Sequence, residues 1–482
     1  MKIEKLEFFI NPLKLYPFLN QGKRLDQLVL LHDATEKGYS VIAYGTRILS
    51  ESYKWMNAEG SGEPRRVLNE LQEFINREKP KWEEYISRHP FVQEISTLPF
   101  IYGPVGFFSY DFGLQFEKLI SKLPHDETCP AYYFVVPEEI LIFDHQNKTM
   151  WCVVGSEGSE PSSIIDFYQS LKTINYKEAL IVTEDEHEQV KSNLTEREYA
   201  MKIYEIKNYL CDGETYQVNF SQRFSFESRR SPWEMYKEIC RTNPTRFQGF
   251  VSGTHAGKKF WVVSNSPERL FHVTVDERGR AIETWPIKGT IGVKGYDSDA
   301  EIADKAKALL DSAKDRAELE MIVDMSRNDL GRICEFGSVE VKEHRVLERY
   351  SHLFHTVSRI AGRLKKEVKL FDIMRALFPG ASITGCPKKR TMEIIDRTED
   401  RARGVYCGSL GYFDVRGGAD FNIMIRTLFA MAPTGATSHS PSSSFFYTMN
   451  AGGGVVIDSR PEAEYKETFD KIGAFLQALR SN

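Results

Sequence analysis

The sequence predicts an α+β fold, and two observations lead to this expectation. Strand-like segments with alternating or continuous apolar residues occur in both halves of the 482-residue chain, and amphipathic helical segments lie among them. The two kinds of segment do not alternate regularly, as they would in a parallel, doubly wound sheet of the Rossmann type. The sequence also contains no internal repeat.

The amino-terminal half should contain both strands and helices. Residues 40–44 and 132–136 are rich in β-branched and aromatic side chains, which favours strands. The apolar periodicity of residues 66–84 predicts a helix. Residues 183–193 are polar and follow neither period, so we interpret them as a linker or surface excursion between two halves. The sequence therefore predicts one domain over residues 1–185 and a second domain over residues 194–482.

The carboxy-terminal half begins with a helix signal. Thr195 and Glu198 form a capping-box pattern ahead of an amphipathic helix over residues 199–210. Residues 433–443 are rich in Ser, Thr, Pro and Gly, which predicts a mobile hairpin loop. Pro461 suits the first position of a final helix that should reach Leu479. Between them we expect strands over 259–264 and 269–275, a long helix within 300–333, helices over 370–378 and 388–397, and strands over 404–413, 421–431 and 444–457.

Composition describes a globular protein with no general affinity for polyanions. The chain is 41% hydrophobic and 27% charged, with a formal net charge of -5, so we expect no nucleic-acid or membrane partner. An anionic ligand would have to be held by a local cluster of donors. The seven cysteines form no CxxC pair and are odd in number, which favours a reducing, cytoplasmic location. Residues 1–19 mix charges and prolines with apolar residues, unlike a signal peptide.

A glycine-rich segment, Asn450 to Val455, follows a predicted strand. Glycines without side chains let backbone N–H groups approach an anion, and a carboxylate would suit such a site as well as a phosphate. The alternative is that these glycines only shape a bend. No Walker or GxGxxG pattern accompanies the segment, so nucleotide binding has no support.

Two groups of glutamates are candidate metal ligands. Glu464 and Glu467 are three residues apart on the predicted final helix, so they share a face. Glu318 and Glu320 lie on the predicted long helix. Carboxylates that converge from separate helices, with few histidines nearby, favour Mg²⁺ over zinc. The alternative is that these glutamates only face solvent.

Three cationic or titratable residues stand out from their surroundings. Lys288 lies between Pro286 and Gly289, which predicts a turn, and a lysine held there away from water would have a lowered pKa and act as a nucleophile. Arg426 interrupts the apolar run 421–429, so it should face a structural or a substrate carboxylate. His355 is a candidate acid or base, or a core histidine. A solvated surface lysine is the alternative for Lys288.

The segments Asp212 to Arg223, Ser266 to Arg269 and Pro286 to Thr290 are the first of an ordered set that continues to Lys471. This set resembles the chorismate-utilising enzymes, and among them aminodeoxychorismate synthase component I. The resemblance implies the fold of anthranilate synthase component I, with antiparallel β-sheets packed as a sandwich and helices outside. The set covers most of the second half of the chain, and residues 102–111 add a familiar stretch to the first half. It comprises Asp212 to Arg223, Ser266 to Arg269, Pro286 to Thr290, Asp315 to Arg332, Arg349 to Ser358, Pro379 to Lys388, Tyr406 to Phe413 and Ala451 to Lys471.

The resemblance implies a role for each matching position. Glu318 and Glu467, with Glu464 beside them, match the ligands of a Mg²⁺ ion that holds the ring carboxylate of chorismate. Glu268 matches the general acid that protonates the departing C4 hydroxyl, which requires a raised pKa. The positions that match substrate-binding groups are Gly289, Thr290, Tyr406, Arg426, Gly452, Gly453, Gly454 and Lys471.

Two further matches imply which nucleophile is used and where it attacks. Relatives that add water carry a lysine at the position of Gln217, and glutamine cannot deprotonate water, so amination is favoured. Lysine at position 288 resembles the aminodeoxychorismate synthases, where its amine attacks C2 before ammonia attacks C4. Anthranilate synthases usually carry alanine there, aminate C2 directly, and use the counterpart of His355 in pyruvate elimination. Anthranilate synthase component I is therefore the alternative activity, in tryptophan biosynthesis, and a catalytically idle subunit is a second one.

The source of ammonia should be a second protein. No Gly-x-Cys-x-Gly motif of a glutamine amidotransferase occurs in the sequence, so we expect a separate glutaminase subunit to supply ammonia. The sequence departs from the family pattern at Trp285, where arginine or tyrosine is common, and at Ile291, where arginine is frequent. The segments Leu30 to Asp33 and Arg246 to Gln248 replace the usual tryptophan-pocket motifs, so inhibition by tryptophan is not expected.

Overall fold

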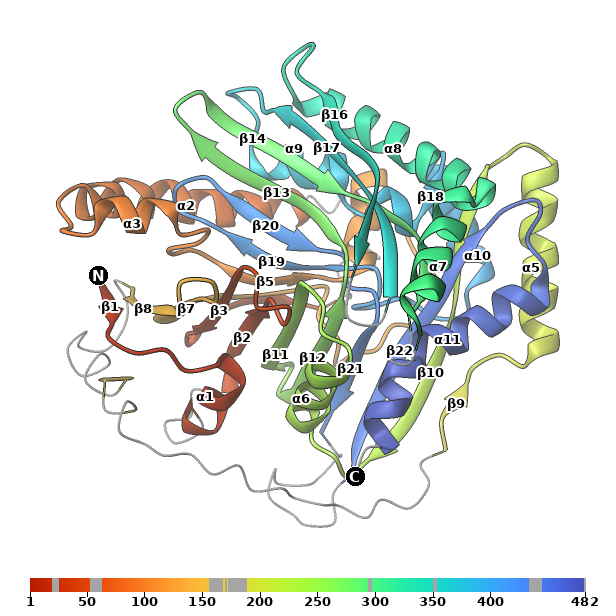
Figure 1. The fold of residues 1–482 in the computed structure, drawn as a ribbon, viewed down its shortest axis with the longest axis horizontal. Helices are drawn as coiled ribbons and strands as arrows, with labels where there is room; N and C mark the ends of the chain where they lie inside the picture. The colour runs from red at the N-terminus through yellow and green to blue at the C-terminus, as the bar shows by residue number, and fades with distance from the viewer. Residues whose placement is uncertain are drawn as a thin grey trace.

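The computed structural model contains two large antiparallel sheets with helices around them (Figure 1). The structure describes residues 1–19, 26–52, 63–155, 168, 169, 171, 189–293, 297–349, 353–432 and 444–480. This is the predicted α+β class with antiparallel sheets. The expected loop over residues 433–443 lies outside the described residues, as does most of the expected linker.

The first sheet has twelve strands among the described residues. A short strand, β9 (Lys191–Ser192), forms at the described end of the expected linker and pairs with β10. The other strands, in spatial order, are β1 (Lys2–Leu6), β8 (Thr149–Val154), β7 (Glu139–Asp144), β3 (Tyr39–Tyr44), β2 (Leu28–His32), β11 (Phe247–His255), β12 (Lys258–Ser266), β21 (Thr427–Met431), β22 (Phe445–Val455), β10 (Gln217–Ser228) and β18 (Gly385–Cys386).

The second sheet has ten strands among the described residues. Strand β16 (Glu340–Arg349) pairs with β17 outside the main order. The other strands, in spatial order, are β15 (Ile287–Gly292), β17 (Leu353–Arg363), β14 (Gly279–Trp285), β13 (Arg269–Asp276), β20 (Ala419–Asn422), β19 (Ser409–Phe413), β5 (Val105–Phe108), β6 (Tyr132–Val136) and β4 (Arg47–Glu51). Each sheet therefore contains strands from both sides of the predicted domain boundary, and the division into two domains stays a prediction.

The two sheets pack face to face through aromatic side chains. Phe107 of β5 and Tyr133 of β6 meet Phe260 of β12 edge to face, with ring centres 6.2 Å and 5.0 Å apart. All three rings are fully buried, and burial of such large apolar surfaces is the main stabilising contribution in a sandwich core. Residues from several strands of each sheet belong to one continuous apolar cluster.

Helices cover the outer faces of the sheets. Helix α8 runs beside β16 and β17, and α5 and α11 lie together next to β22 and β10 (Figure 1). None of the described helices is both long and apolar enough to cross a membrane. The helices are α1 (Pro12–Leu19), α2 (Glu63–Ser87), α3 (Val92–Thr97), α5 (Glu196–Cys211), α6 (Pro232–Thr242), α7 (Asp299–Asp311), α8 (Ala313–Ile333), α9 (Leu370–Leu377), α10 (Lys388–Thr398) and α11 (Pro461–Arg480), with 3₁₀ turns η4 (Tyr110–Glu117) and η6 (Ala381–Ile383).

Most of the expected elements are confirmed, and the capping box at Thr195 is present as predicted. Two expected elements are each divided in the structure. The long helix within residues 300–333 breaks at Ser312, whose side chain accepts a hydrogen bond from the Asp315 N–H and so starts α8 as a new helix. The strand expected over 421–431 breaks at residues 423–426, where Arg426 has a φ of 51°.

Candidate active site

A pocket of about 850 Å³ opens where α8 and α11 approach β15 and β22. Its size suits a small organic molecule. Every site residue predicted from the sequence lines it except Gln217 and Glu320. The lining residues in this set are Glu268, Lys288, Gly289, Thr290, Glu318, His355, Tyr406, Arg426, Gly452, Gly453, Gly454, Glu464, Glu467 and Lys471.

Lys288 lies on a strand rather than in the turn that the sequence predicts. It is the second residue of β15 and pairs with Thr356 of β17. The register shifts directly after Lys288, because Gly289 adopts a φ of 83° and forms an irregularity in the strand. Pro286 lies between β14 and β15 and ends the pairing of β14. The backbone around Lys288 is therefore constrained as expected, but in a strand at the edge of the sheet.

The amine of Lys288 is held by a carboxylate. Its Nζ lies 2.8 Å from Oε2 of Glu318 on α8. Burial lowers the pKa of Lys288, but the charge and hydrogen bond of Glu318 outweigh burial and raise the pKa above its ordinary value. The predicted lowered pKa is therefore wrong for this arrangement, because Glu318 stabilises the ammonium form. Lys288 can act as a nucleophile only after this ion pair has opened.

Glu268 is a buried carboxyl group suited to donating a proton. Its side chain receives hydrogen bonds from the Ser382 hydroxyl, at 2.7 Å, and from the Ile287 backbone N–H. Burial raises the pKa of Glu268 to about 7, although these hydrogen bonds and the charges of Lys288 and Arg426 act in the opposite direction. The raised pKa that the sequence required of this residue is confirmed by its surroundings.

The glutamates of α8 and α11 face one another across the pocket. Nζ of Lys314 lies 3.8 Å from Oε1 of Glu318 and 3.9 Å from Oε1 of Glu464, so carboxylates from two helices converge on one cation. This oxygen donor set suits a hard divalent ion such as Mg²⁺. Among the described residues, no three carboxylate, His or Cys side chains already form a closed metal cluster. The residues therefore fit Mg²⁺ in donor chemistry without being preformed around it.

The two glutamates of α11 differ in charge environment. Burial raises the pKa of Glu464, which accepts a hydrogen bond from Ser459 at 2.7 Å. Burial also acts to raise the pKa of Glu467, but Lys471, at 2.6 Å, outweighs it and lowers that pKa. Glu320, the other glutamate singled out on α8, points away and pairs with Arg316 at 2.9 Å.

The glycines of β22 form one wall of the pocket. A Cβ atom at Gly453 would lie 3.2 Å from Glu464 and 3.4 Å from Glu467, so any side chain there would press on these two carboxylates. Lys471 donates a hydrogen bond to the Gly452 carbonyl at 2.7 Å, which places its ammonium at the same wall. The glycine segment is therefore a pocket wall within a strand, not a phosphate-binding loop.

Arg426 lies in the break between β20 and β21, not inside one strand as expected. Its left-handed backbone turns the side chain into the pocket, and no carboxylate of the described residues lies within ion-pair distance of its guanidinium. Burial lowers the pKa of Arg426, partly offset by Glu268. A partly buried guanidinium that no carboxylate of the described residues pairs with is suited to binding an anionic ligand.

His355 and Tyr406 are both buried in the pocket wall. The Thr290 hydroxyl lies 2.7 Å from Nδ1 of His355. Burial, assisted by the charge of Arg426, lowers the pKa of His355 to about 3, so its ring is neutral at neutral pH. The Tyr406 hydroxyl interacts with Asn219, and burial raises its pKa. Both side chains can therefore act as neutral hydrogen-bonding groups.

Gln217, on the strand β10 that pairs with β22, lies next to the glycine wall and does not line the pocket. Its side chain is fully buried beneath Gly454, where a Cβ atom would come within 2.8 Å of the Gln217 amide. Neither amide atom has a hydrogen-bond partner within the part of the chain that the structure describes. Its expected influence on the nucleophile stays a prediction, because Gln217 lies against Gly454 of the pocket wall without lining the pocket itself.

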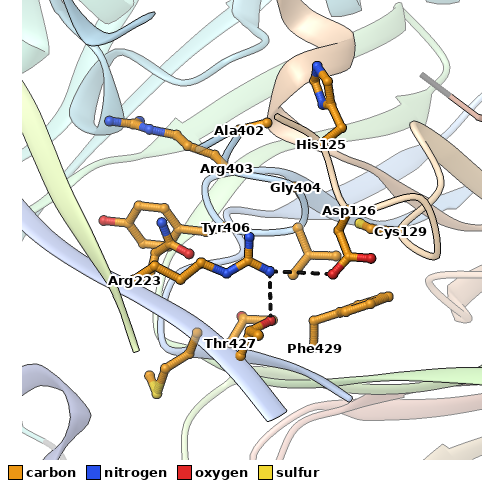
Figure 2. Close-up of a pocket in the computed structure, with 14 residues that line it drawn as sticks. His125, Asp126, Cys129, Arg223, Ala402, Arg403, Gly404, Tyr406, Thr427 and Phe429 are labelled. Atoms are coloured by element: carbon orange, nitrogen blue, oxygen red, sulfur yellow. Dashed lines mark hydrogen bonds and ion pairs between the residues drawn. The ribbon is translucent and has the colours of Figure 1, made fainter. Parts of the chain in front are cut away.

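A second, smaller cavity shares part of this wall. It measures about 20 Å³ and shares the lining residues Tyr406, Met449 and Asn450 with the large pocket. Figure 2 shows Arg223 reaching across it towards Asp126, whose carboxylate lies 3.5 Å from the guanidinium. This cavity has room for a molecule of water size only, so it cannot hold the ligand of the large pocket.

Two pocket residues were missed by the sequence analysis. Ser382 lies within the quoted segment Pro379 to Lys388, but nothing in the segment indicated that its hydroxyl would reach Glu268. Lys314 precedes Glu318 by one helical turn, and this i,i+4 spacing could have indicated the contact. Its approach to Glu464 depends on the meeting of α8 and α11, which local spacing does not reveal.

Comparison with known proteins identifies the family. A family model described as chorismate binding enzyme matches residues 29–477. Aminodeoxychorismate synthase component 1 of Bacillus subtilis (strain 168) is 36% identical over 382 residues, covering 78% of this chain and 77% of that protein. Anthranilate synthase component 1 of Acetivibrio thermocellus is 31% identical over 458 residues, covering 92% and 87%.

The fold comparison agrees with this result. The solved structure of anthranilate synthase component I from Streptococcus pneumoniae TIGR4 matches with a TM-score of 0.71 at 27% identity, covering 91% of this chain and 92% of that one. The expected anthranilate synthase component I-like fold is thereby confirmed. With a family match over nearly its whole length, the chain belongs to the chorismate binding enzyme family and is a chorismate-utilising enzyme.

Proposed function

We propose that the chain is component I of an aminodeoxychorismate synthase, which converts chorismate and ammonia to 4-amino-4-deoxychorismate for 4-aminobenzoate and folate biosynthesis. The observation that carries the proposal is Lys288 in the pocket wall, near both Glu318 and the acid Glu268. A covalent substitution needs a nucleophile and an acid that protonates the leaving group, and a lysine amine beside a buried proton donor can supply both. Curated relatives with this activity in their names are 36% identical to the chain.

The cationic side of the pocket would hold the carboxylates of chorismate. Arg426 has no carboxylate partner among the described residues, and Lys471 lies at the glycine wall. A guanidinium can bind a carboxylate through two parallel hydrogen bonds. Tyr406, Thr290 and the backbone of Gly452, Gly453 and Gly454 would add neutral contacts. These groups support binding of a small dianion in one orientation.

Glu318, Glu464 and Glu467 would hold Mg²⁺ between α8 and α11. When bound, the ion would neutralise the ring carboxylate of chorismate. The protein's own contribution is to bring carboxylates from two helices together beside the glycine wall. Glu318 also holds Lys288, so this carboxylate has to leave the ammonium before the amine can react.

The proposed chemistry consists of two substitutions at one ring. The neutral Nζ of Lys288 attacks C2, the C4–O bond breaks, and Glu268 gives its proton to the departing hydroxyl, which leaves as water. The carboxylate of Glu268 recovers a proton from the new C2 ammonium. Ammonia then attacks C4 and the C2–N bond breaks. The lysine leaves as a free amine, because its nitrogen takes up the proton that the new C4 ammonium releases. The sum is chorismate plus ammonia giving 4-amino-4-deoxychorismate plus water.

Ammonia would come from a separate glutamine amidotransferase subunit in the cytoplasm. The relatives are named as component 1 of their enzymes, which supports a two-protein system. The purified chain alone should then accept ammonium far better than glutamine. Equal use of glutamine by the chain alone would contradict this part of the proposal.

Anthranilate synthase component I is the second candidate function. A relative with this name aligns over 92% of the chain, more than the 78% covered by the aminodeoxychorismate synthase of Bacillus subtilis. In that case amination would occur at C2 and pyruvate would be released. Lys288 is the residue that favours the first candidate.

Product identification separates the two candidates. The purified chain is incubated with chorismate, Mg²⁺ and ammonium, with and without added aminodeoxychorismate lyase, and Lys288→Ala is run in parallel. We expect a product that becomes 4-aminobenzoate only with the lyase, and loss of that product in the variant. Anthranilate fluorescence from the unmodified chain would overturn the assignment. Failure to consume chorismate at all would support an idle subunit.

A further inference from the structure

Trp285 makes close contacts with two arginines beside the active site. The guanidinium carbons of Arg269 and Arg359 each lie 4.2 Å from the centre of its ring. Phe247 packs edge to face against the same indole, with ring centres 6.2 Å apart. Guanidinium groups at such distances from an indole are attracted by its π-electrons. We call the indole and these two guanidiniums the Trp285 clamp.

Both arginines of the clamp are themselves held in place. Arg269 forms two hydrogen bonds to Asp420, at 3.0 Å and 2.8 Å. Arg359 contacts Glu343 at 3.1 Å and Glu348 at 2.9 Å. A guanidinium fixed by carboxylates loses little further freedom when it packs on a ring. The clamp is therefore a fixed connection between strands β13, β14 and β17, not a transient surface contact.

One side of the clamp leads directly to the proton donor. Arg269 is the first residue of β13 and directly follows Glu268. Its Cα partner across the sheet is Trp285, and the register shifts immediately after this pair. A register shift leaves the strand end without the regular ladder that would otherwise fix it. The contact of Arg269 with the Trp285 indole therefore helps to fix the start of β13, directly after Glu268.

The other side of the clamp leads to the lysine. Arg359 lies on β17, the strand that pairs with β15, and its neighbour Ser358 donates its N–H to the Pro286 carbonyl at 3.1 Å. The hydroxyl of Thr356, on the same strand, donates to the carbonyl of Lys288. Trp285 precedes Lys288 by three residues. Fixing the indole against Arg359 therefore fixes the segment that carries the amine.

We propose that Trp285 is a positioning residue that sets the separation of Glu268 from Lys288, and through it the choice between the C4 and C2 products. The Ile287 N–H, which lies between Trp285 and Lys288 in the chain, is bonded to the Glu268 carboxyl group, so the two reacting groups share this segment. The part on product choice rests on the proposed function. Reacting groups displaced by about 1 Å can lose about 100-fold in rate, so a small movement here is enough.

The alternative is that Trp285 only fills space between the strands. A space-filling role predicts lower stability with unchanged chemistry. A positioning role predicts a lower kcat, an unchanged KM for chorismate, and a changed ratio of products. The variant Trp285→Phe also separates the positioning role from the space-filling role. Phenylalanine keeps the π face but fills less volume, so it should retain kcat only if the contact with the arginines is what matters.

The test compares Trp285→Leu and Trp285→Phe with Trp261→Leu. Trp261 is a buried tryptophan of β12 that does not line the pocket, so it controls for loss of a large aromatic side chain. Each purified chain is assayed for chorismate consumption and for both products with Mg²⁺ and ammonium, and thermal unfolding is followed. We expect Trp285→Leu to lower kcat about 100-fold with KM unchanged and a larger anthranilate fraction, and Trp285→Phe to stay within about fivefold.

A second pair of variants keeps the test decisive if Trp285→Leu does not fold. Arg359→Gln removes one half of the clamp at a side chain that is 30% exposed, and Arg363→Gln removes an arginine of the same strand that pairs with Asp276. We expect kcat to fall about tenfold in Arg359→Gln and to stay unchanged in Arg363→Gln.

Two outcomes would overturn the proposal. One is equal kcat values for Trp285→Leu and Trp261→Leu, or for the two arginine variants. The other is failure of Trp285→Phe to restore kcat. If the unmodified chain makes only anthranilate, the proposed function fails, while the kcat comparison still tests the clamp. The two failures are thereby distinguishable.

Discussion

The two cavities that meet at Tyr406 differ in how their charges are balanced. In the small cavity, Arg223 lies 3.5 Å from Asp126 and donates to the Thr448 hydroxyl at 3.2 Å (Figure 2). The neighbouring Arg403 contacts Glu399 at 2.7 Å and also donates to backbone carbonyls. In the large pocket, Arg426 has no such carboxylate among the described residues. The protein neutralises its own arginines in one place and leaves one for a ligand in the other.

This difference has a physical meaning. Burying a charge is costly unless a partner compensates it. An arginine that is paired with a carboxylate of the protein therefore helps to hold the fold together, whereas an arginine without such a partner can bind the carboxylate of a ligand. Arg223 and Arg403, which have carboxylate partners, hold the loop that carries Tyr406. Arg426, which has no carboxylate partner among the described residues, faces the pocket in which a substrate would react. The same residue type should therefore give opposite phenotypes when it is changed in the two cavities.

The largest contrast is expected for two buried glutamates. Glu268→Gln removes the proposed proton donor and should lower kcat about 1000-fold with little change in stability. Glu399→Gln breaks the buried pair with Arg403 and should lower the free energy of unfolding by about 3–5 kcal/mol. Steady-state chorismate consumption and denaturant unfolding measure the two effects. Retention of a tenth of the activity by Glu268→Gln would exclude its role as the acid.

A smaller contrast is expected for two arginines. Arg426→Gln should lower kcat/KM for chorismate about 100-fold, because it removes a charged hydrogen-bond donor to a substrate carboxylate. Arg223→Gln should leave KM unchanged and lower the free energy of unfolding by about 1–3 kcal/mol, because Asp126 loses its partner. Kinetics over a range of chorismate concentrations, with thermal unfolding of both variants, check this pair. A raised KM in Arg223→Gln would mean that the two cavities are not separate in function.

Local patterns predicted much of the fold and of the pocket, and the exceptions have a common cause. The capping box at Thr195 and the strand over 132–136 depend on neighbours in sequence, so they are confirmed. The break at residues 423–426 depends on the positive φ of Arg426, which the surrounding strands impose. The raised pKa of Lys288 depends on Glu318, thirty residues away on another element. Such facts require the tertiary structure.

The last prediction concerns pH and has the smallest effect. Glu268 acts as an acid only when protonated, and Lys288 acts as a nucleophile only when neutral. Because the pKa of Glu268 is about 7 and the pKa of Lys288 is raised above its ordinary value, kcat should rise with pH up to about 7 and level off above it, where loss of the Glu268 proton offsets the growing neutral fraction of Lys288. The neutral form is also the one that folding favours, since the usual pKa of 4.5 is lower. The stability that the protonated carboxyl group of Glu268 contributes is therefore fully present below pH 4.5 and is lost as the pH rises through 7. Glu268→Gln should therefore lose less stability than the unmodified chain over that range.

Ser382→Ala sharpens this prediction. The Ser382 hydroxyl donates to the Glu268 carboxylate at 2.7 Å and thereby lowers a pKa that burial has raised. Without the hydroxyl, the pKa of Glu268 should rise further, so the pH at which kcat levels off should move higher. At pH 7 the change in kcat should be less than about threefold, because a larger protonated fraction offsets poorer positioning. A pH profile of kcat that moves to lower pH would mean that another group limits the rate.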